Sequence, residues 1–200
     1  MVINPSMEES KILEKLKVIS TKEIAAIQIW DNFEKGQDVI ALIRKIYAIC
    51  HSKNIPLLIN NRWEYLNQIE LDGVHFDVIP DAIDFIRNQV QREFIIGLTC
   101  GNNLNSVEWA AENKVDYISF CSIFPSKSAE ECEIVDHKIV QKARTIFNNY
   151  LFLAGGIYPN NIKALSDIDF DGVAVISGVM DSENPNKTID EYKYEIKQIK

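Results

Sequence analysis

The chain alternates short apolar runs with helix-like segments along its whole length, and this alternation constrains the fold more than any other feature. Each apolar run has the length of a strand, and each segment that follows places apolar residues at helical spacing. This pattern predicts parallel strands joined by right-handed crossovers. The expected strands lie within residues 1–5, 24–30, 55–59, 72–76, 94–98, 117–123, 151–154 and 172–176.

Eight strand–helix units favour a closed TIM (β/α)8 barrel over an open doubly wound sheet. The open sheet stays an alternative if the short apolar start at residues 1–5 is not a strand, although no GxGxxG turn follows it. Ser6 is the expected N-cap of the first helix. The expected helices cover residues 8–19, 39–49, 63–69, 82–90, 106–113, 139–147, 159–165 and 189–199.

One domain over residues 1–200 is expected, because 46% hydrophobic content suffices for one core and no Gly/Ser/Pro-rich linker divides the chain.

The formal net charge of -8 argues against nucleic-acid binding. The four cysteines form no CxxC pair, which favours reduced thiols in a cytoplasm. No apolar run is long enough for a membrane span. The sequence therefore predicts a cytoplasmic protein without nucleic-acid or membrane partners.

Small residues follow the last two predicted strands. Gly155 and Gly156 come directly after residues 151–154, and Ser177 follows residues 172–176. In a (β/α)8 barrel the loops after the seventh and eighth strands hold a phosphate through backbone N–H groups. The pattern predicts a phosphate site at these residues, with turn or helix-packing glycines as the alternative.

The strand ends carry motifs in a recognisable order. These are LINNR (58–62), DGVHF (72–76), IFP (123–125), AGGI (154–157) and DGVAVISGV (171–179). In this order and spacing they resemble the thiamine phosphate synthase family, over about residues 25–185. The resemblance implies a transferase that joins hydroxymethylpyrimidine diphosphate to thiazole phosphate and releases diphosphate with the help of Mg²⁺. Ser122 stands where the related tautomerase branch has its catalytic histidine, so that branch fits less well.

The resemblance also implies roles for particular residues. The pyrimidine diphosphate would be bound by Gln28, Asn60, Thr99, Ser126 and Ser128, of which the last four are the candidate catalytic residues. The thiazole phosphate would be bound by Gly155, Gly156, Ile176 and Ser177. Magnesium would lie near Asn61 and Asp81.

The charged part of the family pattern is missing. Trp30 and Asn32 replace two cations after the second strand, Ala129 replaces a lysine, and Asn61 replaces a carboxylate. Each lost charge-assisted bond is worth roughly 1.5 to 3 kcal/mol. Two alternatives therefore stay open: a degenerate member that binds a phosphorylated ligand or serves as a partner subunit, and another phosphate-handling barrel such as an isomerase. The residues that could compensate are Lys35, Arg62 and Lys127.

Three other features have plain structural interpretations. His75 is expected to be a structural histidine bonded to backbone. Trp30 is expected to plug or reshape the barrel mouth, with a stacking platform for a heterocycle as the alternative. Cys100 and Cys121 are expected to be small core residues, because no His or Asp pattern activates them. Small phosphorylated heterocycles and a second copy of the chain, in a homo-oligomer, are the expected partners.

Overall fold

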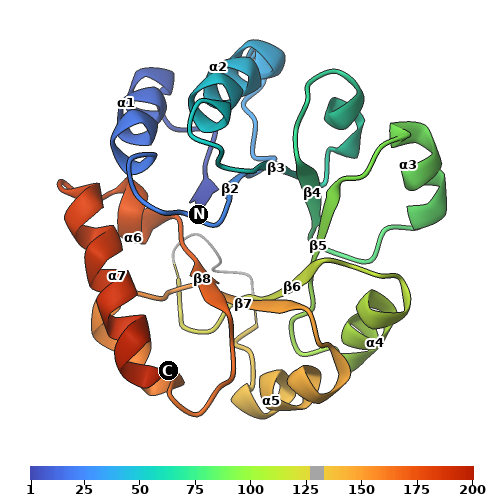
Figure 1. The fold of residues 1–200 in the computed structure, drawn as a ribbon, viewed down its shortest axis with the longest axis vertical. Helices are drawn as coiled ribbons and strands as arrows, with labels where there is room; N and C mark the ends of the chain where they lie inside the picture. The colour runs from blue at the N-terminus through green and yellow to red at the C-terminus, as the bar shows by residue number, and fades with distance from the viewer. Residues whose placement is uncertain (127–132) are drawn as a thin grey trace.

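The computed structural model describes residues 1–126 and 133–200, and it is a TIM barrel of eight parallel strands in chain order (Figure 1). The Val2 N–H donates to the Val175 carbonyl oxygen at 2.9 Å, which brings the last strand to the first. The predicted (β/α)8 fold is confirmed, and the open sheet is excluded. The strands are β1 (Val2–Ile3), β2 (Ile27–Ile29), β3 (Leu57–Asn60), β4 (Gly73–Phe76), β5 (Ile95–Thr99), β6 (Tyr117–Phe120), β7 (Tyr150–Ala154) and β8 (Gly172–Ala174).

Helices surround the strands (Figure 1). Two of the predicted helices are 3-10 rather than α-helices: η1, which ends two residues earlier than expected, and η3. The N-cap of α1 is Glu8 and not Ser6, and its side chain makes no capping hydrogen bond. The helices are α1 (Glu9–Ile19), α2 (Val39–His51), η1 (Trp63–Asn67), α3 (Ile83–Val90), α4 (Leu104–Glu112), α5 (His137–Ile146), η3 (Pro159–Leu165), α6 (Ser177–Met180) and α7 (Pro185–Ile199). Among the described residues, none of these helices is long and apolar enough to cross a lipid bilayer.

Successive strand residues point to opposite sides of the barrel wall. The outward residues, such as Ile27, Ile59 and Leu98, are fully buried against the helices and form the main core. The alternate positions point into the barrel, and several of them are polar, as Gln28 and Asn60 are. The barrel interior is therefore the place where this chain gathers hydrogen-bonding side chains.

Three aspartates at the N-terminal ends of β4, β6 and β8 join these strands to their predecessors. The carboxylates of Asp72, Asp116 and Asp171 accept the backbone N–H of one residue on β3, β5 and β7 at 2.8, 2.7 and 2.7 Å. The N–H of each aspartate returns a bond to the carbonyl oxygen of that same residue, at 2.9, 2.9 and 2.8 Å. We call this arrangement the reciprocal aspartate pair. It fixes the strand register at the end of the barrel opposite the predicted site.

Asp171→Asn is expected to lower the free energy of unfolding by about 1 kcal/mol at pH 7, since it weakens bonds made to a charged acceptor. Burial alone would raise the pKa of Asp171, but the Leu151 N–H and the Arg144 guanidinium, 2.6 Å away, outweigh it and hold the pKa below its usual value. The carboxylate stabilises the fold only while it is ionised. The difference between variant and wild type should therefore shrink as the pH falls through this depressed pKa.

Urea denaturation at pH 7 and at about pH 3 measures this effect. Asp169→Asn is the matched control. Asp169 is exposed, and its Oδ2 lies 3.4 Å from the Nε of the same Arg144. Equal losses in the two variants at pH 7 would show that the bond from Leu151 to Asp171 contributes nothing.

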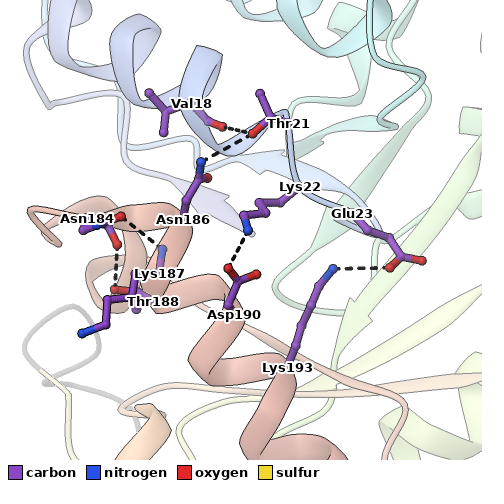
Figure 2. Close-up of polar contacts among 10 residues, drawn as sticks. All are labelled: Val18, Thr21, Lys22, Glu23, Asn184, Asn186, Lys187, Thr188, Asp190 and Lys193. Atoms are coloured by element: carbon purple, nitrogen blue, oxygen red, sulfur yellow. Dashed lines mark hydrogen bonds and ion pairs between the residues drawn. The ribbon is translucent and has the colours of Figure 1, made fainter.

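Helix α7 is tied across the closing seam of the barrel to the connection between α1 and β2 (Figure 2). Lys22 pairs with Asp190 at 2.5 Å, and Lys193 pairs with Glu23 at 3.3 Å. Asn184 caps the helix by accepting the Lys187 N–H at 3.2 Å. Exposed ion pairs of this kind contribute little stability each.

Candidate active site

A cavity of about 380 Å³ opens at the C-terminal ends of the strands. Its lining includes every described residue that we assigned to a substrate from the sequence. Asn61 and Asp81, the expected magnesium neighbours, are not among its lining residues. Ser128 lies outside the described residues. The predicted residues that line the cavity are Gln28, Asn60, Thr99, Ser126, Gly155, Gly156, Ile176 and Ser177.

Asn60 is the most informative residue of the cavity. It is only 2% exposed, and its Oδ1 accepts a hydrogen bond from Gln28 Nε2 on the neighbouring strand. Its Nδ2 has no hydrogen-bond partner among the described residues. A buried donor without an acceptor costs about 1 to 3 kcal/mol. An acceptor atom on a bound ligand would satisfy this donor.

His75 is bonded through both ring nitrogens. Its Nε2 lies 2.8 Å from Thr99 Oγ1, and its Nδ1 lies 3.0 Å from the Tyr117 hydroxyl. The structural interpretation of His75 holds, but its partners are side chains and not the backbone that we expected. Burial lowers the pKa of His75 to about 4, although the charge of Asp77 acts in the opposite direction. The ring is therefore neutral near pH 7.

Tyr117 was not predicted as a site residue. Its hydroxyl donates to Gln28 Oε1 at 3.4 Å, so one chain of contacts runs from Asn60 to Thr99. The one sequence signal for Tyr117 is Gly97, its partner in the register of β5 and β6. A strand glycine marks a place where another group comes close.

Gly155 and Gly156 have left-handed backbones, with φ of +84° and +64°. Both lie against the segment that follows β6. A Cβ on Gly155 would come within 2.0 Å of Ser122 Oγ, and one on Gly156 would come within 2.6 Å of the Phe124 and Pro125 carbonyl oxygens. Both glycines therefore pack against this segment and not against a helix, and both also line the cavity.

Ser177 begins α6 beside these glycines. The first N–H groups of a helix have no acceptor within the helix, so they are available to a ligand oxygen. The Ser177 hydroxyl is 3.1 Å from the Tyr158 hydroxyl. This end of the cavity offers backbone and hydroxyl groups, which are suited to a phosphate.

Two carboxylates lie on either side of Asn61 at the rim of the cavity, in the loops that follow β2 and β4. Asn61 Nδ2 donates to Asp77 Oδ2 at 2.8 Å and to Asp31 Oδ2 at 3.2 Å. Arg62, which could have compensated for a lost cation, instead lies 3.7 Å from Asp31 through its Nε. Asp81 is exposed in the turn before α3. The carboxylates that the structure places beside Asn61 are therefore Asp31 and Asp77.

The cavity carries few charges. Within residues 1–126 and 133–200, no lysine or arginine lines it. Lys127 and Ala129 lie outside the described residues. Trp30 lines the cavity, as expected of a residue that reshapes the mouth, and so does Cys121, while Cys100 is buried in the core.

A second, largely apolar cavity of about 640 Å³ lies at the opposite end of the barrel. It reaches up to Gln28 and His75, which line both cavities. Sequence reasoning did not predict it. Gln28 and His75 belong to the chain of contacts that runs from Asn60 through Tyr117 to Thr99. This polar layer lies between the two cavities.

The fold and the upper cavity are those of a (β/α)8 barrel enzyme with its site at the C-terminal ends of the strands. Residues 1–179 match the family model described as thiamine monophosphate synthase. The chain is 31% identical to thiamine-phosphate synthase of Staphylococcus carnosus over 78% of this chain and 74% of that one. The chain therefore belongs to the thiamine monophosphate synthase family, and it is an enzyme of the transferase type in thiamine biosynthesis.

Two further relatives agree with this. The thiamine-phosphate synthase of Methanobrevibacter smithii is 25% identical over 92% of this chain and 88% of its own length. The solved thiamine phosphate pyrophosphorylase from Pyrococcus furiosus superposes with a TM-score of 0.80 at 19% identity, and covers 99% of this chain and 95% of that one. This last similarity supports the fold.

Proposed function

We propose that this chain is a thiamine phosphate synthase, which transfers the hydroxymethylpyrimidine group from its diphosphate to the nitrogen of thiazole phosphate and releases diphosphate. The observation that carries the proposal is the partnerless Nδ2 of Asn60, buried in the wall of the cavity. An acceptor on the pyrimidine diphosphate would satisfy it. The substrates would be small phosphorylated heterocycles, bound by one domain over residues 1–200, in a cytoplasmic protein that forms a homo-oligomer.

The two substrates would occupy different ends of the cavity. Gly155, Gly156, Ile176 and Ser177 would hold the thiazole phosphate through backbone N–H groups and the Ser177 hydroxyl. The pyrimidine diphosphate would lie toward the other wall. There its binding residues would be Gln28, Asn60, Thr99, Ser126 and Ser128.

Binding both substrates in one cavity supplies much of the catalysis. It places the thiazole nitrogen beside the carbon that loses diphosphate, which converts a bimolecular reaction into one within a complex. Donors such as Asn60 Nδ2 would stabilise the charge that builds up on the leaving group.

Magnesium is part of the proposal, and the rim residues fit it. Asp31 and Asp77 supply hard carboxylate oxygens, the ligands that Mg²⁺ prefers. Asn61 holds the two together, while its own Oδ1 accepts the Asp77 N–H at 3.0 Å. When bound there, the cation would neutralise charge on the leaving diphosphate. The resemblance placed this role on Asn61 and Asp81, so the two assignments have no carboxylate in common.

Asp77→Asn is expected to weaken Mg²⁺ binding by about 10-fold, because it removes one of two carboxylate ligands. Asp81→Asn, the matched control, should leave it unchanged. Titration of the free protein with Mg²⁺ by calorimetry measures both and requires no turnover. A larger effect of Asp81→Asn would instead support the assignment from the resemblance.

An end-point assay for thiamine phosphate tests the function. Purified protein is incubated with hydroxymethylpyrimidine diphosphate, thiazole phosphate and Mg²⁺, and product is measured by fluorescence after oxidation. Product formation is expected. Binding of thiazole phosphate without any product would favour a family member that binds a phosphorylated ligand, or serves as a partner subunit, without turnover.

A further inference from the structure

The loop that joins β7 to η3 forms one wall of the upper cavity. We call residues 155–158 the β7–η3 loop; all four line the cavity, and the first two have left-handed backbones. A phosphate held by backbone N–H groups depends on where the backbone lies, because a backbone N–H cannot rotate toward a ligand as a side chain can. The contacts that fix this loop therefore bear on what the cavity binds.

Asn161 fixes the internal shape of the β7–η3 loop. Its Oδ1 accepts the Tyr158 N–H at 2.8 Å, and its Nδ2 donates to the Gly156 carbonyl oxygen at 2.8 Å. Both contacts are local in the sequence. They hold the loop to the start of η3 and leave its position relative to α6 to other contacts.

Tyr192 reaches the loop from α7. Its hydroxyl donates to the Ile157 carbonyl oxygen at 2.7 Å, and both the bond and the tyrosine side chain are buried. A carbonyl oxygen has no proton to give, so the direction of this bond is fixed. Burial raises the pKa of the Tyr192 hydroxyl, and Tyr158 acts in the same direction, so the hydroxyl keeps its proton. The donor is therefore present throughout the physiological pH range.

Gly178 leaves the space through which Tyr192 reaches the loop. It is the second residue of α6, directly after Ser177, and it lines the upper cavity. A Cβ on Gly178 would lie 2.1 Å from the Tyr192 hydroxyl oxygen and 3.2 Å from its Cζ. The same hydroxyl thus lies against the first turn of α6 and bonds to the loop after β7.

These two segments carry opposite halves of the proposed phosphate site. Gly155 and Gly156 follow β7, whereas Ile176 and Ser177 follow β8. The two halves must keep a fixed separation if their N–H groups are to bind one phosphate together. The Tyr158 and Ser177 hydroxyls also join them, but that contact is exposed, so water competes for both groups. The buried bond from α7 does not face this competition.

We propose that Tyr192 is a positioning residue for the phosphate end of the cavity: its hydroxyl holds the β7–η3 loop beside α6, so that both segments bind the phosphate of thiazole phosphate together. Tyr192 is not among the residues that line the upper cavity, so it acts through the loop and not on the substrate. Gln28 and Asn60, proposed for the pyrimidine diphosphate, lie on β2 and β3, strands that carry neither segment. The ligand rests on the proposed function, while the bond between α7 and the loop rests on the contacts alone.

Tyr192→Phe removes the hydroxyl and keeps the ring. By calorimetry, it should weaken binding of thiazole phosphate by about 10-fold, since one buried hydrogen bond is lost. Binding of hydroxymethylpyrimidine diphosphate should stay within about twofold. In turnover, KM for thiazole phosphate should rise by about 10-fold while kcat stays within about twofold.

Tyr194→Phe is the matched control for this variant, because Tyr194 lies on the same helix and is 62% exposed. It should leave all of these constants unchanged. Unchanged binding of thiazole phosphate in Tyr192→Phe would overturn the positioning role. Equal losses for the two substrates would overturn it as well, because they would indicate a general loss of structure.

Gly178→Ala tests the route by which the hydroxyl reaches the loop. With Tyr192 present, the new Cβ displaces the hydroxyl, so thiazole phosphate binding should weaken by about 10-fold here too. Added to Tyr192→Phe, it should cost no more than about twofold further, because the group that it displaces is already absent. Fully additive losses would show that the two residues act separately, against the inference.

The bond itself is tested without any ligand. In Tyr192→Phe, hydrogen exchange should be about 10-fold faster at the Tyr158 amide and unchanged at the Leu153 amide, which lies within β7. Equal exchange at Tyr158 in variant and wild type would contradict a role of the bond in holding the loop. If wild-type protein binds no thiazole phosphate, the proposed function fails, and the exchange result still decides whether Tyr192 holds the loop.

Discussion

Asn60→Ala is expected to lower kcat/KM for thiamine phosphate formation by about 100-fold. The variant removes a buried donor to a charged group, and such a bond contributes roughly 1.5 to 3 kcal/mol. It also leaves Gln28 Nε2 without the acceptor that now holds it. Steady-state kinetics with each substrate varied in turn measures the loss, which should fall mainly on the pyrimidine diphosphate.

Asn67→Ala is the matched control, because Asn67 is exposed at the end of η1. Asn60→Asp separates two contributions at the same position. It keeps an oxygen for Gln28 but replaces the donor by a charged acceptor, so its activity should be no higher than that of Asn60→Ala. Wild-type kinetics in Asn60→Asp would show that no acceptor of the substrate faces this side chain.

Gly155→Ala is expected to lower the free energy of unfolding by about 3 kcal/mol. A left-handed backbone costs a residue with a Cβ about 1 to 2 kcal/mol, and the new Cβ would also overlap Ser122 Oγ, at the cost of another 1 to 3 kcal/mol. Gly36 has almost the same φ, +85°, and a Cβ at that position would meet no described atom within 4 Å beyond its own chain neighbours. Gly36→Ala should therefore show the backbone cost alone.

Urea denaturation of the two variants compares them directly. The difference between them isolates the contact between the loops that follow β6 and β7. Equal losses would mean that the segment at Ser122 moves aside without cost. In that case the two loops are independent, and the glycines serve the cavity only.

The strands could be located from the sequence because each is a short apolar run between clear boundaries. Their parallel order then brought the C-terminal ends together, which is why residues as distant as Gln28 and Ser177 line one cavity. The 3-10 character of η1 and η3 could not be predicted in this way. The spacing of apolar residues in five to seven positions does not distinguish the two helix types.

The side-chain partners were also beyond sequence reasoning. Tyr117 and Gln28 are 89 residues apart, and their contact depends on the space left by Gly97. The carboxylates that accept from Asn61 are Asp31 and Asp77, contacts that the motif spacing did not indicate. Motif spacing indicates which loops lie near one another, but it does not indicate which side-chain atoms form hydrogen bonds.

The reciprocal aspartate pairs have a consequence for how this barrel tolerates mutation. Each pair joins an aspartate side chain to the backbone of a neighbouring strand, so the partner strand contributes no particular amino acid. The bond itself therefore restricts residues 57, 96 and 151 only against proline, which lacks the N–H, while their burial in the core requires apolar side chains. Three aspartate side chains thus help to set the register at three strand junctions. The register at these three junctions therefore does not depend on which apolar side chain the partner strand carries.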